Sequence, residues 1–382
     1  MLVVWTASRV LFMVTGALGA NLLLGAAPGG FPVEPPGVLN HWAHWDGGWY
    51  SAIASHGYFD TLWPASSNFF PFYPLLVRVG TLVVGGPAVW GVAISLACSL
   101  FALYFLHEIA ADCFGAEAAR AATLALAFFP TAFFLNAVYT EALFLAAATG
   151  CVWAARIRGD FALAGMLGFV AAGTRNVGVL LIFPLVHEWL RHRQSQRAGR
   201  TGLLWLALVP IGLLSYMFWL WRWSSHPLLF TTVVKRTWGR TLTNPITTLD
   251  HAWTRAVDGV VWAVHPERVF ATTSPNPAWG ATETFNFVFL VLLFVLLVGT
   301  VLLVPRGLAV YAVVASLEPL LTPAYVQPLA SLPRYLLSAF PLFLFLGVVL
   351  ARSRVLLIGW LVASSALGVL LTLYFTTWRW VA

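Results

Sequence analysis

The chain has 382 residues, of which 60% are hydrophobic and only 9% are charged, and its formal net charge is +7 at pH 7. A soluble core of this size cannot bury so much apolar surface, so the composition excludes a water-soluble domain and predicts a polytopic membrane protein. The positive charge comes from 20 arginines and one lysine, which suit lipid headgroups and phosphates better than nucleic acid.

The apolar residues form unbroken runs, such as 287–304 and 355–375. Such runs predict membrane-spanning helices, because the strands of a barrel would alternate with period two. Residues 2–24 lack a basic start and a small-residue cleavage site, so we expect a retained first helix. The expected fold is one all-α domain over residues 1–382 with about eleven transmembrane helices. The expected spans are 2–24, 75–106, 118–136, 140–156, 161–174, 177–190, 202–223, 284–304, 308–326, 335–350 and 355–375.

Arginines in short loops indicate how this bundle is oriented. They all fall on one side, which the positive-inside rule makes cytoplasmic. The first external loop, 25–74, and the long external loop, 224–283, then lie on the extracytoplasmic side, together with the conspicuous polar residues. The loop arginines are Arg156, Arg158, Arg191, Arg193, Arg197, Arg200, Arg306, Arg352 and Arg354.

The first external loop contains the most distinctive stretch, residues 41–50, where Asp46 lies among two histidines and four aromatic residues. In a chain with so few acids, such an aspartate is a candidate catalytic residue. If residues 41–54 form an interfacial helix, Trp42, Trp45 and Trp49 share one face and Asp46 points toward substrate. The candidate substrate-binding residues of this stretch are His41, His44, Trp45, Trp49 and Tyr50.

The same stretch has a plainer interpretation. Its tryptophans suit an interfacial aromatic belt, in which Asp46 caps the break at Gly47-Gly48 and the histidines only pack. A His-His-Asp metal site is disfavoured because no second carboxylate lies in the segment. Cys98, Cys113 and Cys151 have no CxxC or zinc-type spacing either. We therefore expect no cofactor and no metal site, although the sequence does not exclude a divalent ion.

Three later tracts add candidate substrate-binding residues. Tyr73, in a proline-rich and aromatic tract, either lines a groove or belongs to a helix start fixed by proline. Glu141, at an external corner, either contacts substrate or stabilises a helix N-terminus. Arg175 and Asn176 interrupt an apolar span, and an unpaired arginine in hydrocarbon costs several kcal/mol. Arg175 should therefore pair with Glu141, with Asp46 or with a ligand phosphate.

Four basic residues are expected on the same outer face as Asp46. They are candidates for holding a phosphate leaving group, with contact to lipid headgroups as the alternative. Arg334 is the strongest candidate because it opens an apolar span directly after Ser331-Leu332-Pro333. The candidate phosphate-binding residues are Lys235, Arg236, Arg240 and Arg334.

These tracts together resemble the PIG-V family, which comprises GPI mannosyltransferase 2 and its bacterial homologues. The resemblance rests on residues 44–58, which read His-Trp-Asp-x-x-Trp-Tyr-x-x-Ile-Ala-x-x-Gly-Tyr, and on 70–74, 136–144, 332–335 and 340–341. The order of the tracts is more specific than any one of them. The Arg175 corner departs from the family pattern, where a further small polar residue is expected. The short, arginine-rich chain suggests a bacterial protein.

The resemblance implies a GT-C-like bundle and an inverting glycosyltransferase whose early external acid, Asp46, is the general base. It implies a polyprenyl-phosphate sugar as donor, with mannose as the sugar, and a lipid-linked or glycan acceptor. The expected location is the bacterial plasma membrane, or the endoplasmic reticulum in eukaryotic relatives, with an extracytoplasmic site among membrane lipids. A lipid transporter or flippase, or a noncatalytic scaffold, would share the composition but would have less use for gathered Asp, Glu and Arg residues.

Overall fold

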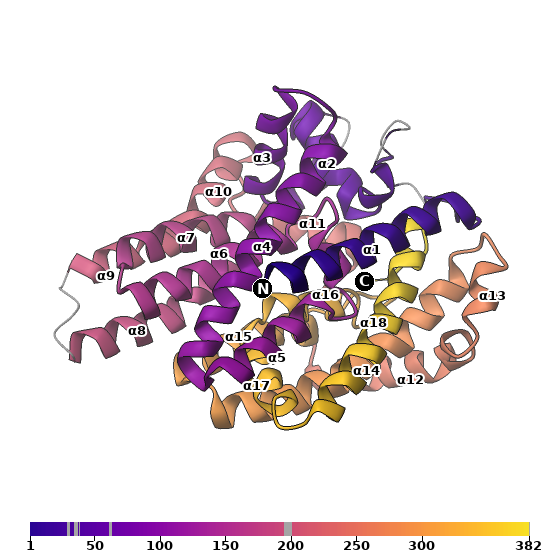
Figure 1. Cartoon of the computed structure of the whole chain (residues 1–382). Coiled ribbons are helices and arrows are strands. Elements are labelled where there is room, and N and C mark those ends of the chain that lie inside the picture. The colour runs from indigo at the N-terminus through magenta and orange to yellow at the C-terminus, as the bar shows by residue number, and fades with distance from the viewer. Residues whose placement is uncertain (29–30, 34–36, 38, 61–62, 195–200, 382) are drawn as a thin grey trace.

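The computed structural model describes residues 1–382 except 29–30, 34–36, 38, 61–62, 195–200 and 382, and this described part is helical without any strand (Figure 1). Arg197 and Arg200 of the expected cytoplasmic set lie outside the described residues. Because the described residues form helices and no strand, the expected all-α fold is confirmed. The α-helices are α1 (Leu2–Leu22), α2 (Asp46–His56), α3 (Phe72–Thr81), α4 (Pro87–Phe114), α5 (Ala116–Ala127), α6 (Glu141–Trp153), α7 (Phe161–Thr174), α8 (Ile182–Gln194), α9 (Thr201–Leu206), α10 (Leu208–Ser224), α11 (Leu229–Trp238), α12 (Pro245–Ala263), α13 (Pro266–Phe270), α14 (Asn276–Leu303), α15 (Arg306–Leu321), α16 (Leu332–Ser338), α17 (Pro341–Leu350) and α18 (Arg354–Thr376).

Five helices in the described part are long and apolar enough to cross a membrane, or six if the bent pair α16 and α17 counts as one span. Fewer helices pass that test than the eleven expected spans because α5, α6, α7, α8 and α15 have only 12, 13, 14, 13 and 16 residues. Two expected spans are also divided. The expected span 75–106 is split into α3 and α4, and the expected span 335–350 bends by 88° between α16 and α17. The count of about eleven spans stays a prediction.

Two expected segments differ from the structure. The expected helix 41–54 is wrong: residues 40–42 form a short 3-10 turn, and α2 begins only at Asp46. The break occurs because Trp45 has a φ of 57°, which a right-handed helix cannot accommodate. Trp42, Trp45 and Trp49 therefore do not form one helical face. The long external loop 224–283 contains three complete helices, α11 to α13, and the start of α14.

Helix α6 connects two charged clusters. It packs between α4 and α7, begins at Glu141, and continues through a π-helical turn to Arg158. At its far end Arg156 pairs with Asp112 at 2.6 Å and with Glu188 at 2.7 Å. At a rise of 1.5 Å per residue, these two ends are roughly 20–25 Å apart. That separation agrees with the expectation that Glu141 and the loop arginines lie at opposite membrane faces.

Helix α1 is held to the bundle by a buried arginine. It lies beside α18, and its Arg9 is only 3% exposed (Figure 1). The Arg9 guanidinium donates to the carbonyls of Ala127 and Ala132 and to the Asn136 side chain. These acceptors lie at the end of α5 and in the turn that follows. Arg9 therefore supplies donors to backbone and side-chain acceptors at the point where the chain turns toward Glu141.

Replacing Arg9 with alanine should lower the free energy of unfolding by about 3 kcal/mol, because buried acceptors would lose their donors. Arg120→Ala is the control, since Arg120 is 65% exposed and pairs only with the exposed Glu117; its effect should stay within about 0.5 kcal/mol. Unfolding of the purified protein in mixed detergent measures both variants. Equal, small effects would contradict the role given to Arg9.

Candidate active site

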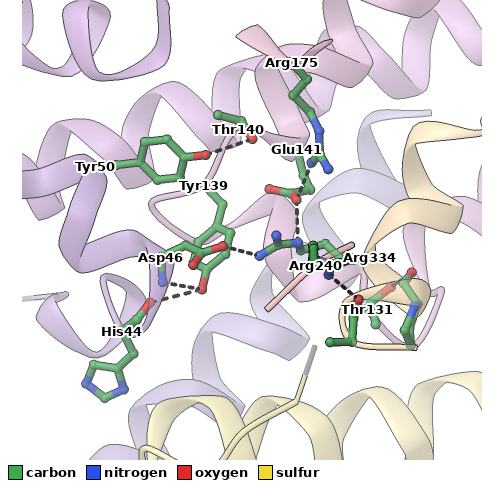
Figure 2. A network of polar contacts seen from close by, with 12 residues as sticks. His44, Asp46, Tyr50, Thr131, Tyr139, Thr140, Glu141, Arg175, Arg240 and Arg334 are labelled. Carbon is green, nitrogen blue, oxygen red and sulfur yellow. Dashed lines mark hydrogen bonds and ion pairs between the residues drawn. The ribbon is translucent and has the colours of Figure 1, made fainter. Parts of the chain in front are cut away.

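Four charged side chains form an alternating row at one end of the bundle. Asp46 Oδ2 lies 2.7 Å from Arg334 Nη1, and Arg334 Nε lies 3.0 Å from Glu141 Oε1. The same Glu141 oxygen lies 2.6 Å from Arg175 Nη1 (Figure 2). The sequence analysis expected Arg175 to pair with Glu141, with Asp46 or with a ligand, and the structure pairs it with Glu141. The row brings together residues that are up to 288 positions apart in the chain.

The helix ends that carry these side chains favour their charges. Asp46 and Glu141 are the first residues of α2 and α6, and Arg175 directly follows the last residue of α7. The helix dipole stabilises negative charge at an N-terminus and positive charge at a C-terminus. Each of the three groups is therefore placed where the local backbone stabilises its ionised form.

The backbone before Asp46 is strained and fixed by its neighbours. Trp45 has φ 57° and ψ −123°, a conformation that costs energy for a residue with a side chain. Edge-to-face packing against Phe31, Trp378 and Trp380 holds its indole ring. This strain turns the chain sharply so that the next residue, Asp46, starts a helix beside Arg334.

Tyr139 and Gly48 complete the support of this turn. The Tyr139 hydroxyl donates to the His44 carbonyl at 3.1 Å and accepts from the Asp46 amide at 3.2 Å. A Cβ at Gly48 would lie 2.0 Å from the Pro32 carbonyl oxygen, so only glycine lets that backbone cross α2. Tyr139 and Gly48 thereby position Asp46 through its backbone.

Asp46 faces a cavity of about 1350 Å³. Its carboxylate is held by Arg334 through one oxygen, and its side chain is 14% exposed. Aromatic rings, including Trp45 and Trp380, form one part of the cavity wall. Apolar side chains of η5 (Asn176–Leu181), α10 and α11 form another part. These are Val177, Val179, Leu180, Leu213, Phe230 and Val234.

The cavity has an excess of positive charge. The guanidiniums of Arg175, Arg240 and Arg334 all lie within 6 Å of the ring centre of Tyr335. Two of them are neutralised by Asp46 and Glu141, whereas Arg240 donates to the backbone carbonyls of Thr322 and Ala330. Within the described part of the chain, one of the three guanidinium charges, that of Arg240, therefore has no carboxylate paired with it. Lys235 also lines the cavity and adds a second positive charge.

The structure brings most, but not all, of the expected site residues to this cavity. Glu141 is 2% exposed and does not line the cavity, but it forms ion pairs with Arg175 and Arg334, which do. Arg236 is exposed and is not part of the wall. The expected residues that line the cavity are Trp45, Asp46, Tyr50, Arg175, Asn176, Lys235, Arg240 and Arg334.

The remaining expected residues pack away from the cavity wall; for the histidines this is what the plainer interpretation proposed. His44 stacks on Trp378 with ring centres 3.9 Å apart, and its Nδ1–H donates to the Phe375 carbonyl. Its ring points away from Asp46 (Figure 2), and neither His44 nor His41 is part of the cavity wall. Trp49 stacks on Phe69, and Tyr73 donates to the Gly91 carbonyl from a fully buried position.

Several residues of the site escaped the sequence analysis. Tyr139 was part of the family tract but carried no assigned role, and Tyr335 directly follows Arg334. Glu318 and Trp380 line the cavity from the ends of α15 and of the chain. The sequence analysis assigned no role to either residue. The one local signal for Glu318 was its position directly before Pro319, close to the end of an expected helix.

Metal ligation finds little support in the described residues. These residues contain no group of three or more His, Cys, Asp or Glu side chains that could hold a metal ion. Asp46 and Glu141, the two acids of the ionic row, are paired with arginines. The row is therefore organised around guanidinium groups.

Comparison with known proteins gives a family match and a shared fold. The family model described as Mannosyltransferase (PIG-V) matches residues 1–193, which include Asp46, Glu141 and Arg175. A solved structure of ArnT from Cupriavidus metallidurans bound to undecaprenyl phosphate has a TM-score of 0.51 at 15% identity, covering 94% of this chain and 62% of that chain. This chain thus spans less than two thirds of that protein. This likeness confirms the expected fold, an all-helical bundle like that of ArnT.

A second solved structure is less similar. Archaeal oligosaccharyltransferase AglB from Archaeoglobus fulgidus, in complex with an inhibitory peptide and a dolichol-phosphate, has a TM-score of 0.43 at 12% identity. The alignment covers 98% of this chain and 56% of that chain, and a likeness this weak carries no argument. No curated protein matches the sequence.

Protonation of His44 should destabilise the fold. Burial lowers the pKa of His44 from its ordinary 6.5 to about 4, against the opposing effect of the Phe375 hydrogen bond. As the pH falls below about 6.5 the unfolded chain takes up this proton first, so the free energy of unfolding should fall by up to about 1.4 kcal/mol per pH unit until about pH 4. Thermal unfolding between pH 7 and pH 4 measures this slope. His44→Gln should flatten it, and parallel curves for the two proteins would contradict the assignment.

Proposed function

Because the chain belongs to the mannosyltransferase (PIG-V) family, we propose that this integral membrane protein transfers mannose from a polyprenyl-phosphate donor to a hydroxyl group of a lipid-linked or glycan acceptor. The observation that carries the proposal is the Asp46 carboxylate, held by Arg334 at the wall of a large cavity that also presents Lys235 and Arg240. A base and an anion-binding region in one cavity are what this displacement requires.

Asp46 acts as the general base. The acceptor oxygen attacks the anomeric carbon of the donor sugar while its proton passes to the Asp46 carboxylate. The bond between the anomeric carbon and the phosphate oxygen breaks, and the lipid phosphate leaves with the electron pair. This single displacement inverts the anomeric configuration. Arg334 fixes the direction of the carboxylate by binding Oδ2, so Oδ1 is the oxygen that receives the proton.

The leaving phosphate binds at Arg240 and Lys235. Arg334 and Arg175 are compensated by Asp46 and Glu141, so they contribute less net attraction to an anion. The guanidinium of Arg240 has no carboxylate partner among the described side chains, and a charge without a carboxylate partner attracts phosphate most strongly. Two of the four expected phosphate-binding residues, Lys235 and Arg240, therefore remain in the proposal. Arg334 instead holds Asp46, and Arg236 is not part of the cavity wall.

The cavity also suits the lipid portion of the donor. The apolar side chains of η5, α10 and α11 provide a dry wall for the first prenyl units. The site lies at the end of α6 opposite the Arg156 cluster, which the positive-inside rule assigns to the cytoplasm. We therefore place the reaction on the extracytoplasmic face of a bacterial plasma membrane, where a lipid-linked sugar is the accessible donor.

Replacing Asp46 with asparagine should lower the turnover of labelled polyprenyl-phosphate mannose by about 10²–10⁴-fold, because the base is lost while the side chain keeps its shape. The donor KM should change little. Thin-layer separation of labelled glycolipid product measures the rate, and thermal unfolding verifies the fold. A folded Asp46→Asn protein with near-normal turnover would remove Asp46 from the mechanism.

Two adjacent residues of α11 give a matched test of phosphate binding. Both side chains are exposed, but Lys235 lines the cavity and Arg236 does not. Lys235→Ala should raise the donor KM about tenfold, which corresponds to the loss of one charge-assisted hydrogen bond. Arg236→Ala, which removes the same charge, should leave that KM within about twofold. Equal effects of the two variants would show that only general surface charge attracts the donor.

A further inference from the structure

The cavity contains a carboxylate that the proposed reaction does not use. Glu318 lies in the last turn of α15, and Asp46 is the only other acid among the described residues of the cavity wall. Glu318 is partly buried. Within the described residues, no Arg, Lys or His forms an ion pair with it, in contrast to Asp46 and Glu141. This carboxylate therefore faces the cavity without a direct ion-pair partner among the described residues.

The Asn176 side-chain amide is hydrogen-bonded to this carboxylate. Asn176 Nδ2 donates to Glu318 Oε1 at 3.3 Å, and Asn176 itself lines the cavity. Asn176 follows Arg175, whose guanidinium is fixed by Glu141. The amide therefore lies on a backbone that the ionic row already holds in place.

The pair lies in the part of the cavity wall that adjoins both Arg175 of the ionic row and the segment that binds Arg240. On one side it adjoins Arg175. On the other side the backbone carbonyl of Glu318 accepts from Thr322, whose own carbonyl accepts from Arg240 at 3.0 Å. A sugar ring bound in this cavity therefore shares it with the pair, with Asp46 and with Arg240.

The chemistry of the pair suits sugar hydroxyls. Each hydroxyl both donates and accepts, and a carboxylate beside a carboxamide offers acceptors and a donor at adjacent positions. An uncompensated carboxylate repels phosphate, and a prenyl chain placed against it would leave it desolvated without a partner. Neighbouring hydroxyls of a hexose are the one portion of the reactants that this pair can bind favourably.

We propose that Glu318 and Asn176 form the subsite that recognises neighbouring hydroxyls of a hexose. The inference rests on the proposed function, since a hexose enters this cavity only as part of the donor or of a glycan acceptor. Both sources present the same chemistry, and the experiment separates them. Glu318 and Asn176 thereby determine which sugar is bound, whereas Asp46 carries out the proton transfer.

Binding by the full-length protein in detergent tests the subsite without relying on turnover. Polyprenyl-phosphate mannose and sugar-free polyprenyl phosphate are titrated into wild type, Glu318→Ala and Asn176→Ala, and a mannose-terminated glycolipid is titrated separately. Glu267→Gln is the control, because Glu267 is an exposed acid that is not part of the cavity wall.

If the subsite binds the sugar of the donor, Glu318→Ala should weaken binding of polyprenyl-phosphate mannose about tenfold. The affinity for the sugar-free lipid should stay within twofold of wild type. If it reads the acceptor, only the mannose-terminated glycolipid loses about tenfold in affinity. Unchanged binding of both sugar ligands, or equal weakening of the mannosyl and sugar-free lipids, would overturn the inference. Sugar-dependent binding by a wild-type protein that transfers no mannose would instead refute the proposed function and leave the subsite standing.

Discussion

The site depends on the two ion pairs of the Arg334 guanidinium, which binds carboxylates from two different parts of the chain. Asp46 starts α2, Glu141 starts α6, and Arg334 lies in the first turn of α16. Buried charges contribute little net stability once desolvation is counted, but an unpaired one is strongly unfavourable. The three helix ends therefore fit together in the arrangement that lets every one of these charges find its partner.

This pairing divides the arginines of the site into two kinds. Arg175 and Arg334 are compensated, so they act as rigid supports that orient carboxylates. Arg240 donates to two backbone carbonyls and, among the described residues, forms no ion pair with a carboxylate. Chemical type alone does not distinguish these roles, since all three guanidiniums surround the same ring, that of Tyr335. The positions of Asp46 and Glu141 make the difference.

The aromatic residues around Asp46 serve the backbone more than the ligand. Trp45 adopts its strained conformation because Phe31, Trp378 and Trp380 enclose its ring. His44 belongs to the same packed group, stacked on Trp378. The C-terminal residues thus support a turn that lies more than 300 positions earlier in the chain. Of this cluster, Trp45, Asp46 and Tyr50 line the cavity, and the packed rings hold the backbone around Asp46.

Local sequence determined the helical class, the membrane environment and the family tracts, and it singled out Asp46 as a candidate, because these follow from apolar runs and from motifs confined to a few residues. The limits of α7 were predicted to the residue. Tertiary structure alone decided that Glu141 would hold two arginines, that His44 would pack away from the cavity, and that Glu318 would enter it. Those outcomes depend on contacts between helix ends far apart in sequence, and the side chains compete there for partners that no local pattern records.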